Sequence, residues 1–391
     1  GLTWTFAVRG DSRWTNGDPV TARDFAYSFR RVLDPATGAP YADTLWCLRG
    51  ARAVTDGSGG AEALGVRAPD DRTLVLELER PTPQLPCLLL LAPLLPVHQG
   101  CVETWGRDWI RPEHIVTNGP YRLVERKVRD RLRLARHEGY WGRAEVRLAT
   151  IDAYAAEGIT TQLNLYLTGQ VDWMIKPPTG LYGALLPRPD AVRGPQAGTT
   201  FMRFNTTRRP FDDPDVRRAL TLALDREALA RDVMRGGELP ATSFVPAGLG
   251  GYEPAALAPA DAEAARALLA QAGYPGGAGF PRLTYSFSTT SGNQRRAEFL
   301  QAQWKQNLNI DVQLNSMESK AYQDAFKNKN YELAFGGWGA DYPDPQDWFN
   351  TLFGCKGGNN KYNYCNPTFD SIVAQADNGI DLSDRVVQYN Q

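Results

Sequence analysis

The sequence predicts an α/β protein whose C-terminal half is built on a mainly parallel sheet. From about residue 200 onward, strand-like and helix-like segments alternate, which is typical of parallel strands joined by right-handed crossovers. Before that point short strands and turn signals predominate, which favours a smaller β-rich domain. At 391 residues the chain has room for two or three domains. Its hydrophobic share of 42% and charged share of 22% indicate packed cores rather than disorder.

The N-terminal region, residues 1 to about 122, combines short strands with one clear helix. Its opening segment, "LTWTFAVR", alternates apolar and polar residues as a strand does, and the turn sequence "NGD" follows. Over 20–34 apolar residues recur at helical spacing, and Thr21 is a candidate N-cap. Two further elements are expected: a strand over 70–80, and a turn followed by a hairpin over 117–136.

The C-terminal half begins with a helix that Asp213 and Pro214 open and whose apolar positions continue to Val233. A stretch rich in proline and glycine, 246–259, is interpreted as a long surface loop. A second helix follows it and ends at Gly273. The remaining elements are strands over 283–288, 310–314 and 331–338, with helices over 295–307 and 319–328.

The ends of two predicted strands mark the place where a ligand is expected. In open sheets of this kind, ligands lie outside the carboxyl ends of the strands. The segments "STTSGN" (288–293) and "GGWGAD" (336–341) follow such ends, and the second contains Trp338 and Asp341. Two interpretations of Asp341 remain open: it caps the turn before Pro343, or it receives a cationic ligand.

The residues around Trp338 indicate which ligand the second interpretation would involve. Gly337 and Gly339 leave their backbone N–H and C=O groups uncovered, so an extended peptide could pair with them as an added strand. A desolvated carboxylate at Asp341 would suit the α-ammonium of such a peptide. Trp338 would supply a rigid apolar wall.

Composition and motifs argue against several other functions. The formal net charge is −1, so the chain lacks a basic footprint for nucleic acid and a polybasic membrane patch. The most apolar run, 85–97, is broken by prolines and is shorter than the roughly 20 residues of a bilayer span, so it is interpreted as a buried segment. No hydrolase, NTPase or dinucleotide motif is present, and the three histidines stand in unrelated contexts. We therefore expect no enzymatic activity and no cofactor.

A metal site is not predicted either. Asp341, Asp344 and Asp347 recur at every third residue, which differs from the alternate-residue spacing of an EF-hand loop. The five cysteines include no CxxC pair, which argues against a zinc ribbon. The sequence therefore predicts no metal ion at these acids or thiols.

The two C-terminal cysteines bracket a polar, glycine-rich segment. Between Cys355 and Cys365 lies "KGGNNKYNY", a loop that a disulfide could staple, with buried free thiols as the alternative. A disulfide would indicate an oxidising compartment. No pairing is assigned to Cys47, Cys87 and Cys101. The opening segment carries no targeting signal, so export is not inferred from it.

Five long segments occur in a characteristic order. They are "WTFAVRGDSRWTNGDPVTARDFAYSFRRVLDPATGAPYA" (4–42), "IVTNGPYRL" (115–123), "RPFDDPDVRRALTLALDRE" (209–227), "LLAQAGY" (268–274) and "GGWGADYPDPQDWFNTLF" (336–353). Together they resemble the oligopeptide- and dipeptide-binding group of bacterial extracellular solute-binding proteins. The resemblance implies a two-lobed, periplasmic-binding-protein-like α/β fold with an extra β-rich domain and a cleft that closes about a hinge.

The resemblance also implies a domain division. Residues 1–122 would form the extra α+β domain of the peptide-binding group. Residues 123–197 would belong to the first lobe, and 198–391 would form the second lobe around the mainly parallel sheet. The first-lobe segments that the family carries before residue 1 and after residue 391 are absent from this sequence.

The resemblance assigns roles to particular residues. Asp341 would hold the N-terminal ammonium of a peptide, while Gly337, Trp338 and Gly339 would supply main-chain pairing and a pocket wall. Phe201 would line the cleft.

The same resemblance bears on the cysteine pairing and on two positions at the expected site for the peptide C-terminus. It makes the Cys355–Cys365 disulfide the expected pairing. At two positions where oligopeptide binders carry basic groups for the peptide C-terminus, this chain has Phe335 and Asn293.

The implied function is that of an exported, non-enzymatic receptor. It would capture short peptides and deliver them to the permease subunits of an ABC transporter. We expect a monomer in the periplasm or another extracytoplasmic space, with or without a lipid anchor. The alternative is a binder of another solute with the same fold, such as an oligosaccharide, haem or a nickel complex.

Overall fold

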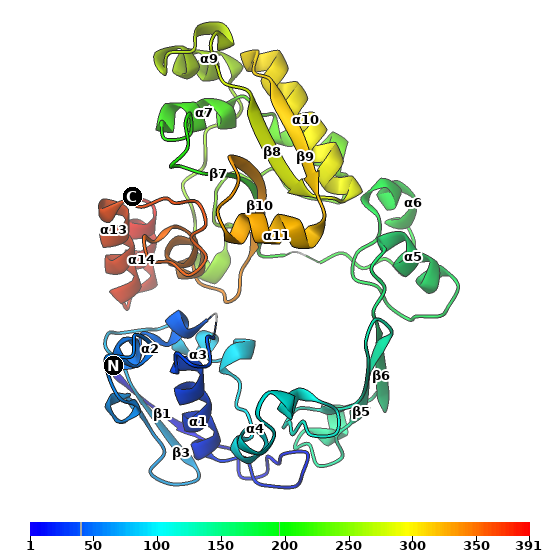
Figure 1. Cartoon of the computed structure of the whole chain (residues 1–391), viewed down its shortest axis with the longest axis vertical. Helices are drawn as coiled ribbons and strands as arrows, with labels where there is room; N and C mark the ends of the chain where they lie inside the picture. The colour runs from blue at the N-terminus through cyan, green and yellow to red at the C-terminus, as the bar shows by residue number, and fades with distance from the viewer. Residues whose placement is uncertain (40, 195) are drawn as a thin grey trace. The chain divides into compact units, whose positions relative to one another are not determined.

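The computed structural model describes residues 1–39, 41–194 and 196–391. The chain folds into two compact units, Gly1–Gly158 and Ile159–Gln391 (Figure 1). Each unit has its own sheets and is described separately below. The predicted domain boundaries after residues 122 and 197 fall inside the first and the second unit, respectively, and stay predictions.

The first unit contains a three-stranded antiparallel sheet in the order β1-β3-β2. Its strands are β1 (Thr3–Ala7), β2 (Val66–Arg67) and β3 (Thr73–Glu77), and its helices are α1 (Ala22–Leu33), α2 (Ala51–Thr55), α3 (Leu85–Leu88) and α4 (Gln99–Trp105). Helix α1 begins where the sequence predicts, because the Asp24 carboxylate accepts a hydrogen bond from the backbone N–H of Thr21 at 2.7 Å. Short 3-10 helices are η1 (Ala42–Leu45), η2 (Ala61–Ala63), η3 (Ala92–Leu94), η4 (Gly106–Ile110) and η5 (Arg143–Glu145).

A second antiparallel sheet follows in the same unit, in the order β4-β5-β6. It contains β4 (Tyr121–Lys127), β5 (Arg131–Arg136) and β6 (Thr150–Tyr154). The hairpin predicted over 117–136 is confirmed. The apolar run 85–97 is only partly buried, because Leu85, Leu88 and Leu94 are buried whereas Leu90 is exposed. Within the described part of the chain, every helix is too short or too polar to span a lipid bilayer.

The second unit is organised around a four-stranded mixed sheet in the order β7-β10-β8-β9. Its strands are β7 (Gly198–Phe204), β8 (Leu283–Ser288), β9 (Val312–Met317) and β10 (Leu333–Gly339). Strands β8, β9 and β10 are parallel, and β7 pairs antiparallel with β10. The predicted α/β class and the mainly parallel pairing are confirmed, and the carboxyl ends of β8 and β10 lie at the same edge.

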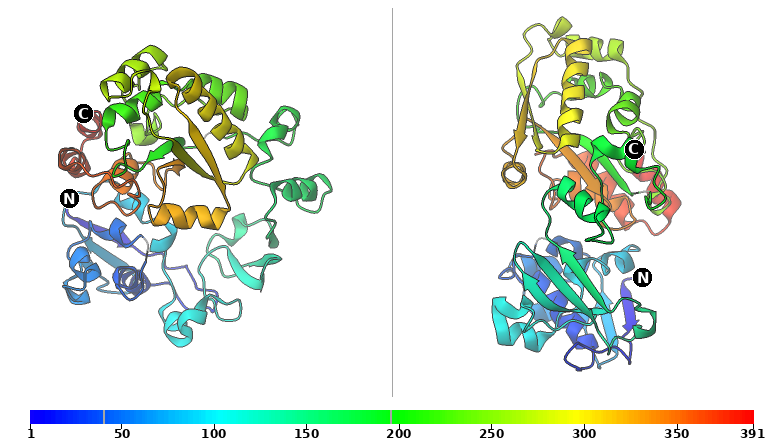
Figure 2. Two further views of the ribbon diagram at one scale, coloured as in Figure 1. Left: turned by 45° about the horizontal axis from the view of Figure 1, so that its top comes forward. Right: turned by 90° about the vertical axis from the view of Figure 1, so that its right-hand side faces the viewer.

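Helices cover this sheet and extend beyond it. They are α5 (Ile159–Leu167), α6 (Tyr182–Leu185), α7 (Pro214–Leu222), α8 (Arg226–Ala228), α9 (Ala262–Gln271), α10 (Ser291–Leu308), α11 (Ser319–Lys327), α12 (Gln346–Trp348), α13 (Pro367–Asn378) and α14 (Leu382–Tyr389). Shorter helical turns are η6 (Thr179–Leu181), η7 (Leu229–Met234), η8 (Leu249–Gly251), η9 (Pro275–Gly277) and η10 (Phe349–Phe353). Helix α10 runs alongside β8 and β9 in every view (Figures 1 and 2). Its Trp304 is fully buried and donates to the Leu220 carbonyl at 2.9 Å.

The continuous helix predicted from Pro214 to Val233 is wrong. Helix α7 ends at Leu222, and a new helix begins after Asp225, whose carboxylate accepts a hydrogen bond from the Ala228 N–H at 2.9 Å. An aspartate that caps a following turn competes with the helix it interrupts. The other predicted helices and strands of this unit are present, with ends displaced by up to four residues.

The stretch 246–259 is more than a surface loop. Its Leu249 and Tyr252 are buried in a second core cluster that also contains Trp348 and Tyr389. Gly250 adopts a φ of 58°, and a Cβ atom there would lie 2.3 Å from the carbonyl oxygen of Pro343. This close approach packs the stretch against the loop that follows β10.

We predict that Gly250→Ala destabilises the protein more than Gly248→Ala does. Both glycines have positive φ, so either alanine costs about 1 kcal/mol of strain. Only the Gly250 substitution adds a clash with the backbone of Pro343, and overpacking of this kind costs about 1–3 kcal/mol more. Urea denaturation of the two variants measures the difference. Equal losses of stability would contradict the close packing at Gly250.

Candidate functional site

Strand β10 carries the predicted site at its carboxyl end. Along its whole length it pairs with β7, so that Gly337, Trp338 and Gly339 stand opposite Thr200, Thr199 and Gly198. On the other side, β8 pairs only with Leu333 and Ala334. Beyond Ala334 no described strand pairs with β10 on that side, so an extended ligand has a strand edge to which it could add.

The five predicted ligand-binding residues lie on this strand end and its neighbour. Gly339 and Asp341 are exposed, while Gly337 and Trp338 are half-buried. Phe201 on β7 is opposite Gly336, and its ring lies 4.8 Å from that of Phe244. The structure therefore brings these residues together, which is what a shared site requires, although their contact with a ligand stays a prediction.

Asp347, which the sequence suggested only as a member of a rejected metal-binding pattern, bonds two residues of the candidate site. Asp347 is 1% exposed, and its Oδ2 accepts hydrogen bonds from the indole Nε1 of Trp338 at 2.9 Å and from the backbone N of Asp341 at 2.8 Å. Burial raises the pKa of Asp347 to about 7, even though these two hydrogen bonds lower it. The nearby negative charges of Asp341 and Asp344 raise the pKa further.

Asp344, the third acid of this loop, is fixed by a buried ion pair. Its two oxygens accept bonds from the Arg385 guanidinium at 2.9 and 2.7 Å. Asp344 also accepts from the Gln346 N–H at 2.9 Å. The two carboxylates therefore bond backbone N–H groups of the loop: Asp344 that of Gln346, and Asp347 that of Asp341. Helix α14 therefore holds the loop that carries Asp341.

Arg203 on β7 occupies the space that Gly336 leaves. It is 9% exposed, its guanidinium lies 3.8 Å from the ring centroid of Phe326, and it donates to the carbonyl of Gly337 at 3.3 Å. Its Nε is buried and has no hydrogen-bond partner among the described residues. A Cβ atom on Gly336 would lie 2.7 Å from that Nε. Gly336 is thus needed to admit a buried cation beside the strand end.

A third basic residue lies beside the two positions where the sequence departs from the family pattern. The Arg296 guanidinium lies 4.7 Å from the ring centroid of Phe335 and donates to Asn293 Oδ1 at 2.9 Å. Burial lowers the pKa of Arg296. Arg296 could not be predicted from the sequence, because its proximity to Phe335 depends on how α10 packs against the sheet.

The cysteines and histidines make contacts that stabilise the fold and lie outside the candidate site. Cys355 and Cys365 form the expected disulfide, whereas Cys47, Cys87 and Cys101 are free. The histidines make structural contacts: His98 accepts from the Cys101 N–H and contacts Asp18 at 3.0 Å, His114 stacks on Trp105, and His137 contacts the Gly119 carbonyl. Residues 1–39, 41–194 and 196–391 contain no group of three or more His, Cys, Asp or Glu side chains that could hold a metal ion.

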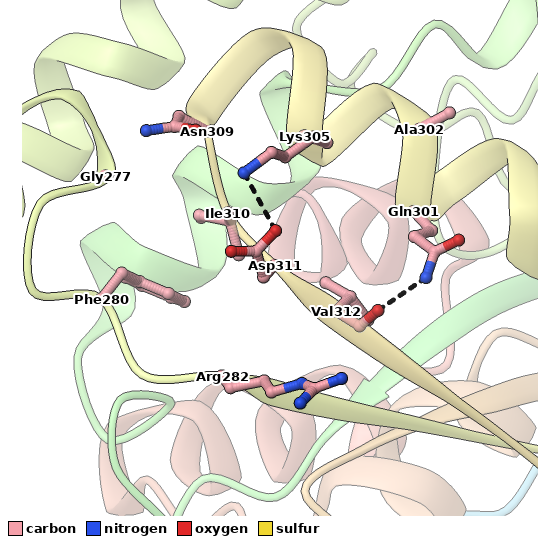
Figure 3. Close-up of a pocket in the computed structure, with 10 residues that line it drawn as sticks. All are labelled: Gly277, Phe280, Arg282, Gln301, Ala302, Lys305, Asn309, Ile310, Asp311 and Val312. Atoms are coloured by element: carbon pink, nitrogen blue, oxygen red, sulfur yellow. Dashed lines mark hydrogen bonds and ion pairs between the residues drawn. The ribbon is translucent and has the colours of Figure 1, made fainter.

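A hollow of about 820 Å³ lies at the opposite edge of the second unit's sheet (Figure 3). Arg282 and Asp311, which precede β8 and β9, line it, and Lys305 of α10 pairs with Asp311 at 2.9 Å. Because β8, β9 and β10 are parallel, this is the amino-terminal edge of the sheet, away from Asp341. The hollow is not part of the candidate site.

Comparison with known proteins identifies the family. Residues 1–360 match the model of "Bacterial extracellular solute-binding proteins, family 5 Middle". Over 98% of its length the chain is 30% identical to the oligopeptide-binding protein OppA of Bacillus subtilis (strain 168), covering 73% of that protein. It is also 30% identical, over 100% of its length, to the probable deoxycholate-binding periplasmic protein YgiS of Escherichia coli (strain K12), covering 74% of it. The structure of Haemophilus influenzae OppA in complex with RPPGFSPFR matches with a TM-score of 0.87 and 32% identity, covering 100% of this chain and 78% of that one.

The fold and these matches identify the class of protein, a two-lobed α/β bacterial extracellular solute-binding protein. The chain belongs to family 5 of bacterial extracellular solute-binding proteins. The family resemblance that the five ordered sequence segments indicated is thereby confirmed. The relatives named above are binding proteins.

We predict that Gly336→Ala destabilises the protein by about 1–3 kcal/mol, because the new methyl group displaces the buried Arg203. Gly337→Ala is the matched control on the same strand, since the nearest atom to its Cβ is 3.5 Å away. Urea denaturation compares the two. A Gly336→Ala variant as stable as Gly337→Ala would show that Arg203 is not confined as described.

We predict that Asp347 makes the free energy of unfolding depend on pH. Its folded pKa of about 7 exceeds the roughly 3.9 of an unfolded aspartate, so between these values the folded chain binds more protons. The free energy of unfolding therefore falls as pH rises toward 7, by at most about 1.4 kcal/mol per pH unit from this residue. Asp347→Asn removes this contribution. Parallel pH profiles of wild type and variant in urea denaturation between pH 5 and 8 would disprove the raised pKa.

Proposed function

We propose that this protein captures short peptides and delivers them to the permease of an ABC importer. The observation that carries the proposal is the exposed Asp341 at the carboxyl end of β10, next to a strand edge that β8 pairs only as far as Ala334. An extended peptide adds to this edge through its main chain, so capture depends little on sequence. Oligopeptide-binding relatives support the ligand class.

In this proposal the amino end of the peptide fixes its register. The α-ammonium binds the carboxylate of Asp341 through charge-assisted hydrogen bonds. Gly337 and Gly339 offer main-chain groups, and Trp338 and Phe201 form apolar walls for side chains. Bridging waters accommodate varied peptide side chains at little loss of affinity.

The remaining parts of the proposal follow from the same role. The protein acts outside the cytoplasm, in a periplasmic or extracytoplasmic space, as a monomer that catalyses no reaction. Its partners are the peptide and the permease subunits, with the two lobes of the family fold closing over the ligand. The names of the relatives, one of them a periplasmic protein, support this location.

A second candidate is a solute other than a peptide. The relative YgiS, named as a probable deoxycholate-binding protein, is as similar in sequence as the oligopeptide-binding relative named above. Bile acids, like neutral sugars, carry no ammonium and make no use of a carboxylate such as Asp341. The ammonium is therefore the feature that separates the two candidates.

We predict that free tri- to pentapeptides raise the melting temperature of the full-length protein, and that N-acetylated forms do not. Ligand at about 100 times its dissociation constant adds roughly 2.7 kcal/mol of stability. Acetylation removes the charge that Asp341 binds, and Asp341→Asn removes the partner charge, so either change abolishes the shift. Differential scanning calorimetry measures it.

Two outcomes would contradict the proposal. A shift with deoxycholate, an oligosaccharide, haem or a nickel complex, but with no peptide, would assign another solute to the same fold. A shift with peptides that survives both acetylation and Asp341→Asn would keep the peptide but reject the ammonium site. Asp311→Asn, which removes an exposed carboxylate at the opposite edge of the sheet, is the control for general effects of losing a carboxylate.

A further inference from the structure

We propose that Asp347 is a positioning residue for the Asp341 site, and that its ionisation makes the affinity for a cationic ligand rise with pH. The inference rests on the proposed function, since it concerns how Asp341 receives an ammonium group. It starts from contacts of Asp347 that link two of the predicted ligand-binding residues.

The geometry places Asp347 between the two residues. A single oxygen, Oδ2, accepts the Trp338 Nε1–H at 2.9 Å and the Asp341 N–H at 2.8 Å. It thereby fixes the orientation of the indole relative to the backbone that carries the Asp341 carboxylate. At 1% exposure Asp347 does not reach solvent, so it acts through these residues and not by touching the ligand itself.

The surroundings of Asp347 contain an excess of negative charge. The negative charges of Asp341 and Asp344, both in its own loop, act on Asp347. Tyr342 of the same loop stays neutral, because burial and the charges of Asp347, Asp344 and Asp377 raise its pKa, and Arg385 of α14 bonds Asp344. The single cation of this group, Arg385, pairs with Asp344 at 2.7 Å. Asp347 forms no ion pair with any residue that the structure describes. A cation arriving at Asp341 would therefore be the charge that favours the ionised form of Asp347.

The direction of the effect follows from linkage. An ammonium near Asp347 lowers its pKa from about 7, so binding releases a proton where the free protein still holds one. Affinity for the cation is then weakest at low pH and rises as pH approaches 7. An opposite charge within about 4–6 Å lowers a pKa by about 1–3 units. A shift of about 1 unit, from about 7, corresponds to about a fivefold gain in affinity between pH 5 and 7.

The pH window isolates this residue. The three histidines of the chain, at 98, 114 and 137, all precede Ile159, so the unit that carries Asp341 contains no histidine. Unperturbed carboxylates titrate below pH 5, and the α-ammonium of a peptide titrates above about 7.7. Between pH 5 and 7 no group with an ordinary pKa in that unit or on the peptide ends changes its charge.

The test is isothermal titration calorimetry of the full-length protein with alanine peptides of three to five residues, between pH 5 and 7. We expect affinity to rise about fivefold over this range, with up to about half a proton released on binding, as two buffers of different ionisation enthalpy reveal. In Asp347→Asn both effects vanish, while the amide oxygen still accepts from Trp338 and Asp341. Asp311→Asn, which removes an exposed carboxylate at the opposite edge of the sheet, keeps the pH dependence.

A second measurement reports Asp347 without a ligand. The Trp338 indole resonance in a ¹⁵N-labelled protein shifts with a midpoint near pH 7, and Asp347→Asn abolishes this titration. Peptide binding that requires Asp341 but does not vary between pH 5 and 7 would overturn this inference alone. Failure of any peptide to bind at any pH would overturn the proposed function, and this inference with it.

Discussion

Three aspartates and one arginine are buried together where the C-terminal helices meet the loop after β10. Asp344, Asp347, Asp377 and Arg385 are 8%, 1%, 2% and 4% exposed. A buried charge is costly unless it has a partner or sufficient hydrogen bonds. Arg385 neutralises Asp344 through two hydrogen bonds, while Asp377 accepts from the Tyr389 hydroxyl at 2.6 Å and from Gln346 at 3.0 Å. Among the described residues, the Asp347 carboxylate accepts from the Trp338 Nε1–H and the Asp341 N–H, both of the candidate site, so this cluster contacts the site directly.

The sequence predicts the parts of this arrangement that depend on local patterns. Short-range periodicity predicts strand β10. The rule that ligands lie at the carboxyl ends of parallel strands points to Asp341 and to the glycines around Trp338. The break at Ala223–Asp225 could not be predicted from apolar spacing, because the capping preference of Asp225 overrode it. The contacts of Asp347 with Trp338 and Asp341 could not be predicted from the sequence either. It depends on the chain folding back so that a residue nine positions later meets the Trp338 indole. The acid at the start of a short helix, directly before the buried Trp348, was the available signal.

Membership in a family defines a fold more firmly than it defines a ligand. At 30% identity, relatives of this chain carry names that refer to both oligopeptides and deoxycholate. The residues near the strand ends therefore matter more than overall likeness. Here Phe335 and Asn293 are joined by Arg296, and Arg203 stands beside Gly337, so two guanidinium groups flank β10 on neighbouring elements.

The unpaired side of β10 also bears on how the protein avoids joining other copies of itself. An exposed strand edge is a template for edge-to-edge association, and proteins suppress it with short, poorly β-forming segments and charge. Gly336, Gly337 and Gly339 have low strand propensity, and Asp341 adds an exposed charge at the tip. The composition that leaves room for an extended ligand is therefore also one that discourages aggregation while the edge is empty.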